Sequence, residues 1–257
     1  MIIGGWQKFS LLDYPGQIAA IIFTKSCNFR CQFCYNPLLV WPSVKKDGSK
    51  LKIKKLPEKG KNEKDHLNHI QFSKQVKEDD LFCFLDKRKG KLDGIVITGG
   101  EPTIQADLPE FITKIKKLGY KVKLDTNGSH PEMLIKLLKA KLLDYIAMDI
   151  KGPREKYRKI TNRKVDFNKI EKSVKIIMNS NLEYEFRTTI VPGLLNIDDI
   201  KKIGKLIKGA KKWWLQNFNS SVDLVNLNYK NKAAFSDEEM KEMQEIASQY
   251  VEKCEIR

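Results

Sequence analysis

Short runs of hydrophobic residues alternate along the chain with longer stretches whose apolar positions recur every three or four residues. The short runs are Ile18–Phe23, Gly94–Thr98, Tyr120–Leu124, Tyr145–Ile150, Tyr184–Val191 and Trp213–Phe218. Most are rich in Ile and Val, and their length and composition predict buried β-strands. The spacing in the longer stretches predicts helices. These cover Asp79–Lys87, Leu108–Leu118, Pro131–Ala140, Asn168–Asn179, Ile197–Ile207 and Ser236–Glu252, the last of which closes the chain.

Strands that alternate with helices predict an α/β fold in which helices cover a parallel sheet. Six β/α units are too few for a closed eight-stranded barrel and more than a minimal doubly wound domain needs. Periodicity alone leaves a partial barrel and an open sheet as alternatives. In both, the carboxyl ends of the parallel strands share one edge of the sheet.

Cysteine, glycine and charged residues gather at the point where each predicted strand ends. These clusters are Cys27, Gly99–Pro102, Asp125–Gly128, Asp149–Lys151, Val191–Gly193 and Gln216–Asn217. Active sites of parallel α/β folds are built at this edge. We therefore expect the six clusters to converge on one site.

The composition suits a globular protein with one substantial core, because 41% of the 257 residues are hydrophobic. Ile18–Phe23 is far too short to span a membrane. The first residues, MIIGGWQKFSLLDYPG, lack the basic and apolar regions of a signal peptide. We expect a cytoplasmic protein with no membrane partner.

The net charge of +16 is partly local. Between Ser43 and Lys77 there are eleven Lys and four acidic residues, so 11 − 4 gives +7 for this segment. A basic segment can bind nucleic acid, but aromatic residues that could stack on bases hardly interleave with this one. We expect a solvated insertion at about 43–74, no nucleic-acid partner, and solvated side chains for His66 and His69 within it.

Three of the five cysteines, Cys27, Cys31 and Cys34, lie within eight residues in the spacing Cx3CxxC. An odd number of cysteines with a tight cluster favours metal binding in a reducing compartment over disulfides. Cys83 lies in the apolar run LFCFL and is expected in the core, and Cys254 lies near the carboxyl terminus.

Thiolates are the usual ligands of iron–sulfur clusters and zinc. A structural zinc site needs four ligands, and the fourth is missing from this loop. Three cysteines on a four-iron cubane would leave one iron open to an external ligand. A zinc knuckle completed elsewhere, or buried cysteines spaced by chance, are the alternatives.

The chain resembles the radical S-adenosylmethionine (SAM) superfamily, from about residue 4 to residue 218 with the Lys-rich insertion between. The resemblance rests on Cx3CxxC with Phe33 before its last cysteine, and on Gly99-Gly100-Glu101-Pro102, which is similar to the GGEP motif. Other motifs resemble the activating enzymes of glycyl-radical enzymes, including those of pyruvate formate-lyase and anaerobic ribonucleotide reductase. They are Ser10–Gly16, Leu124–Gly128, Asp149–Lys151 and Arg187–Gly193.

The resemblance implies one radical SAM domain over residues 1–257, folded as a partial (β/α)6 barrel. It implies that Cys27, Cys31 and Cys34 hold a 4Fe–4S cluster and are the catalytic residues, with the fourth iron open to SAM. Reductive cleavage of SAM would give a 5′-deoxyadenosyl radical. Residues implied to surround SAM are Phe33, Tyr35, Gly99, Gly100, Glu101, Pro102, Asp125, Thr126, Asp149, Lys151, Arg187 and Val191.

Particular roles follow from the resemblance. Glu101 would bind the amine of SAM with its carboxylate, and Lys151 would pair with the carboxylate of SAM. Asp125, Thr126 and Asp149 would help to hold a monovalent cation, although Asp125 could instead cap the next turn.

Two aromatic side chains are expected near adenine. Phe33 would offer its ring, and core packing explains that residue equally well. Tyr35 stands where the activating enzymes commonly carry His, and would offer its backbone.

The resemblance favours an enzyme that installs a glycyl radical on an anaerobic ribonucleotide reductase, with a flavodoxin- or ferredoxin-like electron donor. Two alternatives remain. One is a radical SAM enzyme acting on a small molecule. The other is a basic iron–sulfur or zinc protein that binds nucleic acid and would not turn over SAM.

Anaerobic reconstitution should give about four irons per chain, as a cubane held by three cysteines requires. Replacing Cys27, Cys31 or Cys34 by Ala should abolish cluster formation, whereas Cys83→Ala should retain it. Iron analysis and absorption spectra provide the measurement. One bound zinc and no iron under these conditions would contradict the assignment.

Overall fold

The strands of the protein form a single open sheet, as seen in the computed structural model, which describes residues 1–40, 70–71, 76–222 and 224–257. The strands are β1 (Ile3–Ser10), β2 (Ala19–Thr24), β3 (Ile70–Gln71), β4 (Gly94–Gly99), β5 (Lys121–Thr126), β6 (Tyr145–Asp149), β7 (Glu183–Ile190), β8 (Lys212–Asn217) and β9 (Lys253–Ile256). Within the described residues their order is β3-β1-β2-β4-β5-β6-β7-β8-β9. The pairings from β2 to β9 are all parallel, and β1 is antiparallel to both β2 and β3.

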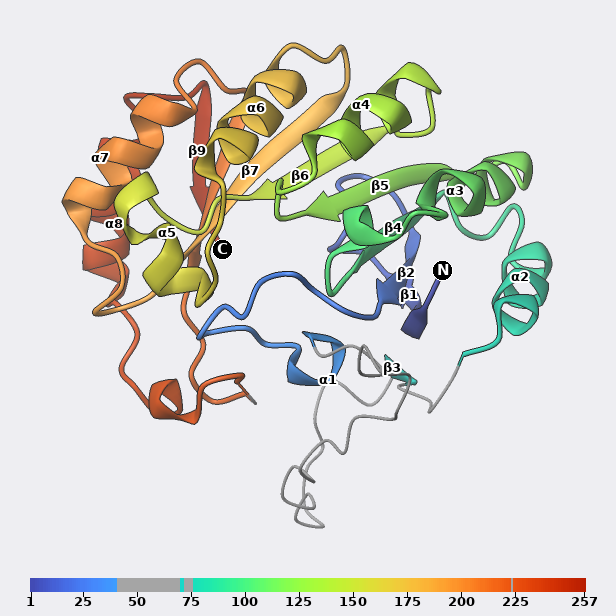
Figure 1. Ribbon diagram of the computed structural model, residues 1–257, viewed down its shortest axis with the longest axis horizontal. Helices are drawn as coiled ribbons and strands as arrows, with labels where there is room; N and C mark the ends of the chain where they lie inside the picture. The colour runs from blue at the N-terminus through green and yellow to red at the C-terminus, as the bar shows by residue number, and fades with distance from the viewer. Residues whose placement is uncertain (41–69, 72–75, 223) are drawn as a thin grey trace.

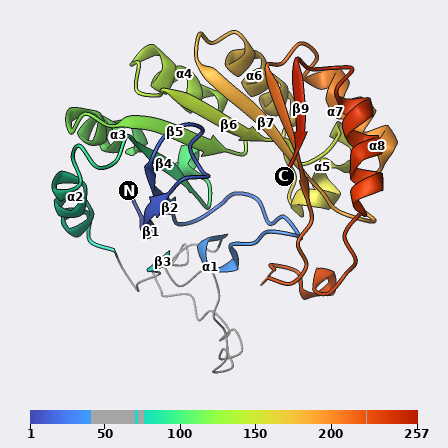
Figure 2. The same cartoon turned by 180° about the vertical axis from the view of Figure 1, so that it is seen from behind.

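Helices line the outer side of the curved sheet in both ribbon views (Figures 1 and 2). They are α2 (Glu78–Lys87), α3 (Leu108–Lys117), α4 (Pro131–Lys139), α6 (Phe167–Met178), α7 (Ile197–Leu206) and α8 (Asp237–Ala247). Shorter elements follow the strand ends: α1 (Pro37–Val40), α5 (Arg154–Thr161) and the 3-10 helices η1 (Pro102–Ile104) and η2 (Leu227–Tyr229). In α3 the buried side chains recur at helical spacing, so this helix has one apolar face.

The two faces of the sheet differ in chemistry because side chains alternate along each strand. In β5, Val122 and Leu124 belong to the large apolar core, whereas the alternate residues Lys123 and Asp125 form an ion pair with each other. A second, smaller apolar cluster fills the inner face beside β2 and β4. It comprises Tyr14, Ala19, Ile21, Phe23, Leu39, Val96 and Tyr145. The inner face is therefore apolar at one side and charged along β5 to β7.

The predicted fold class is confirmed. The fold is α/β, and its sheet is mostly parallel and open, as in a partial barrel. All six predicted strands are present, but β1, the two-residue β3 and β9 were not predicted. The expectation that a helix closes the chain is wrong in part, because α8 ends at Ala247 and β9 follows. These three strands lie toward the sheet edges, and each carries a single β-branched residue.

Two other expectations are affected by the structure. Cys83 is exposed on α2, so its prediction as a core residue is wrong. The Lys-rich insertion at about 43–74, with His66 and His69, lies outside the described residues apart from Ile70–Gln71, whose backbone forms β3. Across the described part of the chain, no helix has the length and apolar character needed to cross a membrane.

The end of β4 packs directly against the loop that follows β2. Gly99 has a φ of 113°, and a Cβ there would lie 2.4 Å from the Thr24 nitrogen. A Cβ on Gly100 would lie 2.0 Å from the Ser26 carbonyl oxygen. The Gly100 N–H donates to Thr24 O and the Glu101 N–H donates to Ser26 O, both at 2.8 Å. These glycines therefore allow two backbone segments to touch, a role that the expectation of ligand contact did not include.

Gly100→Ala should destabilise the protein by about 2–3 kcal/mol, because the new methyl group overlaps rigid backbone. Gly152→Ala is the control: its Cβ would meet Ile160 Cδ1, the end of a flexible side chain, at 2.5 Å. The control variant should lower the free energy of unfolding clearly less. Urea denaturation measures both, and equal losses would contradict the assigned backbone contact.

Candidate active site

Cys27, Cys31 and Cys34 lie on one loop between β2 and α1, and the loop has almost no regular structure of its own. Backbone hydrogen bonds to several distant segments hold it in place. They run from Ser26 N to Leu39 O (2.7 Å), Arg30 N to Thr161 O (2.8 Å), Gln32 N to Ile160 O (3.3 Å), Val225 N to Cys34 O (3.2 Å) and Asn226 N to Gln32 O (3.0 Å). The loop is thus fixed by α1, by the end of α5 and by the segment after β8.

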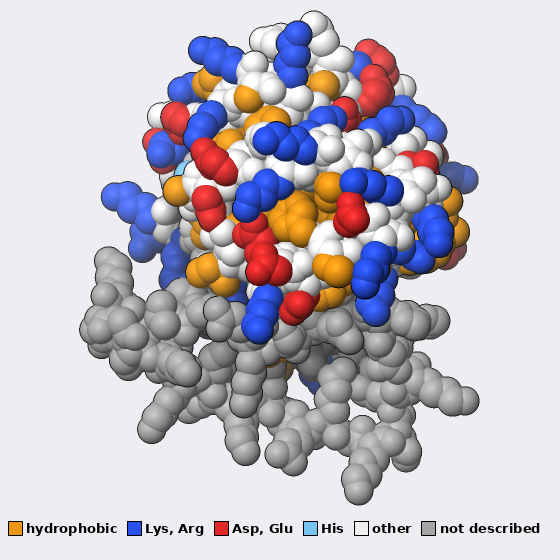
Figure 3. All heavy atoms as spheres, turned by 90° about the vertical axis from the view of Figure 1, so that its right-hand side faces the viewer, with side chains coloured by type: hydrophobic (Ala, Val, Ile, Leu, Met, Phe, Trp, Pro, Cys, Tyr) orange, Lys and Arg blue, Asp and Glu red, His pale blue; other side chains and the backbone are white. Residues whose placement is uncertain are grey.

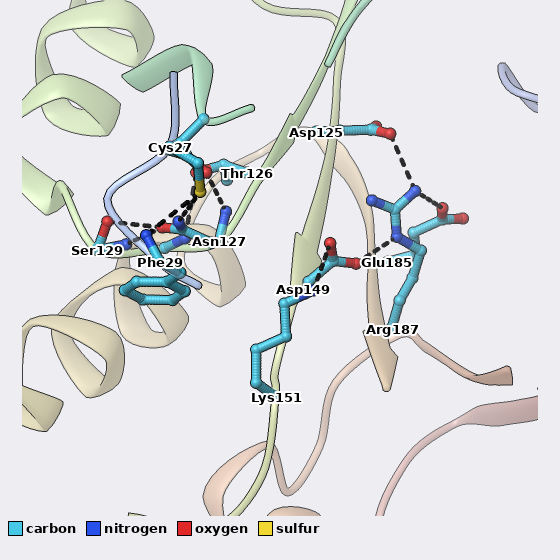
Figure 4. Close-up of polar contacts among 12 residues, drawn as sticks. Cys27, Phe29, Asp125, Thr126, Asn127, Ser129, Asp149, Lys151, Glu185 and Arg187 are labelled. Carbon is cyan, nitrogen blue, oxygen red and sulfur yellow. Dashed lines mark hydrogen bonds and ion pairs between the residues drawn. The ribbon is translucent and has the colours of Figure 1, made fainter. Parts of the chain in front are cut away.

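Cys27 faces the ends of β4 and β5. Its Sγ accepts the Phe29 N–H at 3.3 Å and lies 3.9 Å from the Asn127 amide nitrogen (Figure 4). Asn127 also donates to Asn28 Oδ1 at 2.9 Å, and Asn28 donates to Ser129 Oγ at 2.8 Å. The Phe29 N–H and the Asn127 side-chain amide thus provide donors for a negatively charged sulfur.

The three thiols occupy an environment that disfavours free thiolates. Burial raises the pKa of Cys27 and of Cys31 to about 12, and it also raises the pKa of Cys34. Glu101 adds to the increase at Cys27, whereas Lys151 opposes it at Cys31 and Cys34. Metal binding replaces these protons, because a coordinated thiol is deprotonated.

The donor set fits an iron–sulfur cluster. Three soft sulfur ligands lie on one buried loop, and N–H groups contact one of them. Within the residues that the structure describes, no group of three or more His, Cys, Asp or Glu side chains is arranged to hold a single metal ion. A cubane binds each thiolate through a different iron, so its three sulfur ligands need not converge on one point.

Glu101 is a buried link between the ends of β4 and β5. It is 1% exposed, and one carboxylate oxygen accepts from Thr126 Oγ1 at 2.7 Å while the other accepts from the Asn127 N–H at 2.7 Å. Thr103 donates to it through its backbone and its hydroxyl. Burial raises the pKa of Glu101 despite these donors. The carboxylate has protein partners on both oxygens, which the expectation of a ligand contact alone did not foresee.

Charged side chains from β5, β6 and β7 form a network on the inner face (Figure 4). Arg187 donates to Asp149 at 2.8 Å and to Asp125 at 3.0 Å. Lys123 pairs with Asp125 at 2.5 Å, and Lys151 pairs with Asp149 at 3.1 Å. The structure therefore brings together four of the predicted residues, Asp125, Asp149, Lys151 and Arg187.

The network keeps its members charged. Burial alone would raise the pKa of Asp149 and Asp125, but Arg187 outweighs it, with help from the neighbouring lysines, and both pKa values are lowered. Burial would lower the pKa of Lys151, but Asp149 raises it above its usual value. Arg187 and the lysines thus supply positive charge where a monovalent cation was expected, and that cation stays a prediction.

Phe33 and Tyr35 lie in different surroundings. Phe33 is 4% exposed within the core, with Lys151 Nζ 5.9 Å from its ring centre. Tyr35 is 38% exposed and stacks on Phe218, and its hydroxyl accepts the Asn219 N–H at 3.0 Å. Their contacts with adenine stay predictions.

Two further predicted residues follow strand ends. Pro102 is buried in η1, directly after β4. Val191 is buried directly after β7, and its carbonyl accepts from the N–H groups of Leu194 and Leu195. Their proposed contacts with SAM also stay predictions.

Sequence reasoning missed several residues that shape the site. Asn28, Asn127 and Ser129 form the hydrogen bonds around Cys27, and Asn127 lies inside a predicted cluster without having been given a role. Lys123 and Glu185 complete the charge network, and Glu185 accepts from Tyr145 Oη at 2.9 Å. In both strands charged residues alternate with apolar ones, and this alternation was the sequence feature that could have placed Lys123 beside Asp125 and Glu185 beside Arg187 on one face.

Comparisons with known proteins agree with this arrangement. The family model of the radical SAM superfamily matches residues 21–207. A relative from Methanocaldococcus jannaschii, whose name assigns it as a glycyl-radical enzyme activating enzyme, is 32% identical over 100% of this chain and 95% of the relative. A GTP 3′,8-cyclase from Aquifex aeolicus is 28% identical over 77% of this chain and 54% of the relative.

Among solved structures, SuiB of Streptococcus suis bound to S-adenosylmethionine matches with a TM-score of 0.61. The match covers 92% of this chain and 49% of SuiB, at 13% identity. At this level of identity the similarity concerns the fold.

Arg187→Met should destabilise the protein by about 3–5 kcal/mol, because it leaves buried carboxylates without their main partner. The stability that Asp149 contributes is present at neutral pH and is lost as the pH falls through its lowered folded pKa. Denaturation should therefore show the largest difference between variant and wild type at neutral pH. Lys172→Met, which removes an exposed pair with Glu132, is the control and should change stability little. A similar small effect of both variants would contradict the network's importance.

Proposed function

Because the chain belongs to the radical SAM superfamily, we propose that Cys27, Cys31 and Cys34 hold a 4Fe–4S cluster at which SAM is cleaved reductively. The observation that carries this proposal is the buried loop with its three thiols. N–H groups face the sulfur of Cys27, and the ammonium group of Lys151 lies on the side of Cys31 and Cys34. When bound, the cluster supplies the electron that cleaves the C–S bond of SAM to give methionine and a 5′-deoxyadenosyl radical. The chain's own residues bind and orient SAM and the substrate, and they exclude water from the site.

Lys151 is proposed to bind the carboxylate of SAM. Its side chain is 16% exposed, and its ion pair with Asp149 fixes the ammonium group close to Phe33 and to two of the cysteines. The pairing also keeps the lysine charged, which a charge-assisted hydrogen bond to a carboxylate requires. Asp149 acts in this proposal as a positioning residue for Lys151.

Glu101 is proposed to act on SAM mainly by positioning. Its contacts with Thr103, Thr126 and Asn127 fix the backbone at the ends of β4 and β5. This region borders the loop of Cys27, through the backbone N–H of Glu101 and the side-chain amide of Asn127. The amine of SAM would then meet backbone acceptors held by Glu101, with the buried carboxylate supplying negative charge nearby.

The substrate is proposed to be a backbone glycine of a partner enzyme, with anaerobic ribonucleotide reductase as the specific partner. Hydrogen transfer breaks the glycine Cα–H bond and forms a C–H bond at C5′ of deoxyadenosine. The match over nearly the full length of a relative named as an activating enzyme supports a glycyl-radical enzyme as the partner, whereas the cyclase relative is much longer than the aligned region. The choice of the reductase rests on the resemblance of Ser10–Gly16 to its activating proteins. The partner's loop would complete the exclusion of water from the site.

The test combines the reconstituted protein, SAM, a chemical reductant and an anaerobic ribonucleotide reductase. A glycyl radical should be visible by electron paramagnetic resonance, and partner protein labelled with deuterated glycine should transfer deuterium to 5′-deoxyadenosine. Lys151→Met should lower the yield of both products at least tenfold by weakening SAM binding, since a charged hydrogen bond contributes about 1.5–3 kcal/mol. Lys87→Met, at an exposed position on α2, is the control.

Two outcomes would contradict the proposal at different levels. Cleavage of SAM without a glycyl radical or deuterium transfer in any glycyl-radical enzyme would reject the activating function and favour a small-molecule substrate. No cleavage of SAM by cluster-loaded protein would reject the radical SAM chemistry proposed for this site.

A further inference from the structure

A basic groove opens beside the cysteine loop at the carboxyl end of α5. It has a volume of about 730 Å³. Its charged lining consists of Arg158, Lys159, Arg163, Lys164 and one acid, Glu155. The side chains of all five residues are exposed. The groove thus presents a surplus of positive charge to solvent.

The positive charge of this groove is not neutralised within the part of the chain that the structure describes. None of its four basic side chains forms an ion pair there, although Arg163 donates to the Asn162 carbonyl. The acid, Glu155, is itself paired with Lys202. On the face over α2 and α3, by contrast, basic and acidic side chains are interspersed (Figure 3). Ion pairs such as Lys114–Glu78 connect them there.

The groove reaches the loop that carries the thiols. Gln32, which lies between Cys31 and Cys34 in the chain, forms part of its lining. The Gln32 side chain donates to the Lys159 carbonyl at 2.9 Å, and its N–H donates to Ile160 O at 3.3 Å. Both ribbon views show α5 beside this loop (Figures 1 and 2). A molecule bound in the groove would therefore contact the loop that carries the thiols at the residue next to Cys31.

We propose that this groove is the docking site of a small acidic electron-transfer protein. This inference rests on the proposed function, because a 4Fe–4S cluster that cleaves SAM must be reduced before each cleavage. The carrier is oxidised by one electron and the cluster is reduced by one, with no bond made or broken. The charge of the groove favours an acidic carrier over other one-electron donors, since complementary charge increases the rate of productive encounter.

The location also separates the two partners. The inner face of the sheet and the ends of β5 to β7 are left for SAM and the substrate, whereas the groove lies at α5. A carrier in the groove could therefore deliver its electron without displacing the substrate. No charged residue of the groove belongs to the network around Arg187.

The test uses a variant with Arg158→Gln, Lys159→Gln and Lys164→Gln. The control carries Lys87→Gln, Lys117→Gln and Lys139→Gln, three exposed lysines on α2, α3 and α4 whose loss changes the net charge equally. The probe is a small acidic flavodoxin in its reduced form. Calorimetry at low salt measures its binding to cluster-loaded protein, and stopped-flow absorption measures cluster reduction.

The groove variant should bind flavodoxin about tenfold more weakly, since each exposed charge pair contributes a factor of a few. Its affinity should depend less on salt, and cluster reduction by subsaturating flavodoxin should slow in proportion. The control should change binding less than about twofold. Dithionite should reduce the cluster and support SAM cleavage equally in all three proteins, which shows that the fold and the site are intact.

Two kinds of result would overturn the proposal. The two variants could lose flavodoxin binding equally, which would indicate a general effect of net charge. The groove variant could bind flavodoxin normally yet lose activation of the glycyl-radical partner, or lose binding to an oligonucleotide, which would assign the groove to a different macromolecule. Absence of dithionite-driven SAM cleavage in the unmodified protein would instead contradict the proposed function, and the binding comparison would still report on the groove.

Discussion

The backbone contact between the end of β4 and the loop after β2 is the constraint on which the site depends. A loop without helix or strand cannot by itself fix three sulfur atoms, because each residue must be held against its conformational entropy. Here the N–H groups of Gly100 and Glu101 bind Thr24 and Ser26 at the start of the loop. The absence of a Cβ at residues 99 and 100 permits this approach. Glu101 then connects the same point to β5 through Thr126 and Asn127.

The charged inner face is the second condition for the proposed chemistry. Burying Asp125 and Asp149 is unfavourable unless cations accompany them, and Arg187 bridges the two carboxylates. Asp149 also keeps Lys151 charged at the side of Cys31 and Cys34. A polar and preorganised wall of this kind can orient a zwitterionic ligand without rearranging its own charges. The electrostatic order of the site therefore comes from β5, β6 and β7 together.

The fold was largely predictable because parallel strands are continuous apolar runs, and these stand out from amphipathic helices. The same pattern could not reveal β1, where glycines and polar residues interrupt the apolar positions, nor the short β9. The exposure of Cys83 was missed because an apolar run on a helix does not specify which residue faces the sheet.

The candidate site was predictable as a set of residues and not as a set of contacts. Motifs placed Asp125, Asp149, Lys151 and Arg187 at neighbouring strand ends, and these residues do contact one another. The partners of Glu101 and the basic groove at α5 were not predictable, because both depend on how segments distant in sequence meet. A charge pattern in sequence does not show which charges remain unpaired on the surface.

The most direct test of SAM binding at the cysteine loop is the spectrum of the reduced, cluster-loaded protein with SAM labelled with ¹⁵N in its amino group. Electron–nuclear double resonance would report whether the label is bound at the cluster. If SAM binds at the cluster, it changes the electron paramagnetic resonance signal and adds a hyperfine coupling to the labelled nitrogen. A reduced cluster whose spectrum is unchanged by saturating SAM, with no coupling to the label, would contradict the central claim.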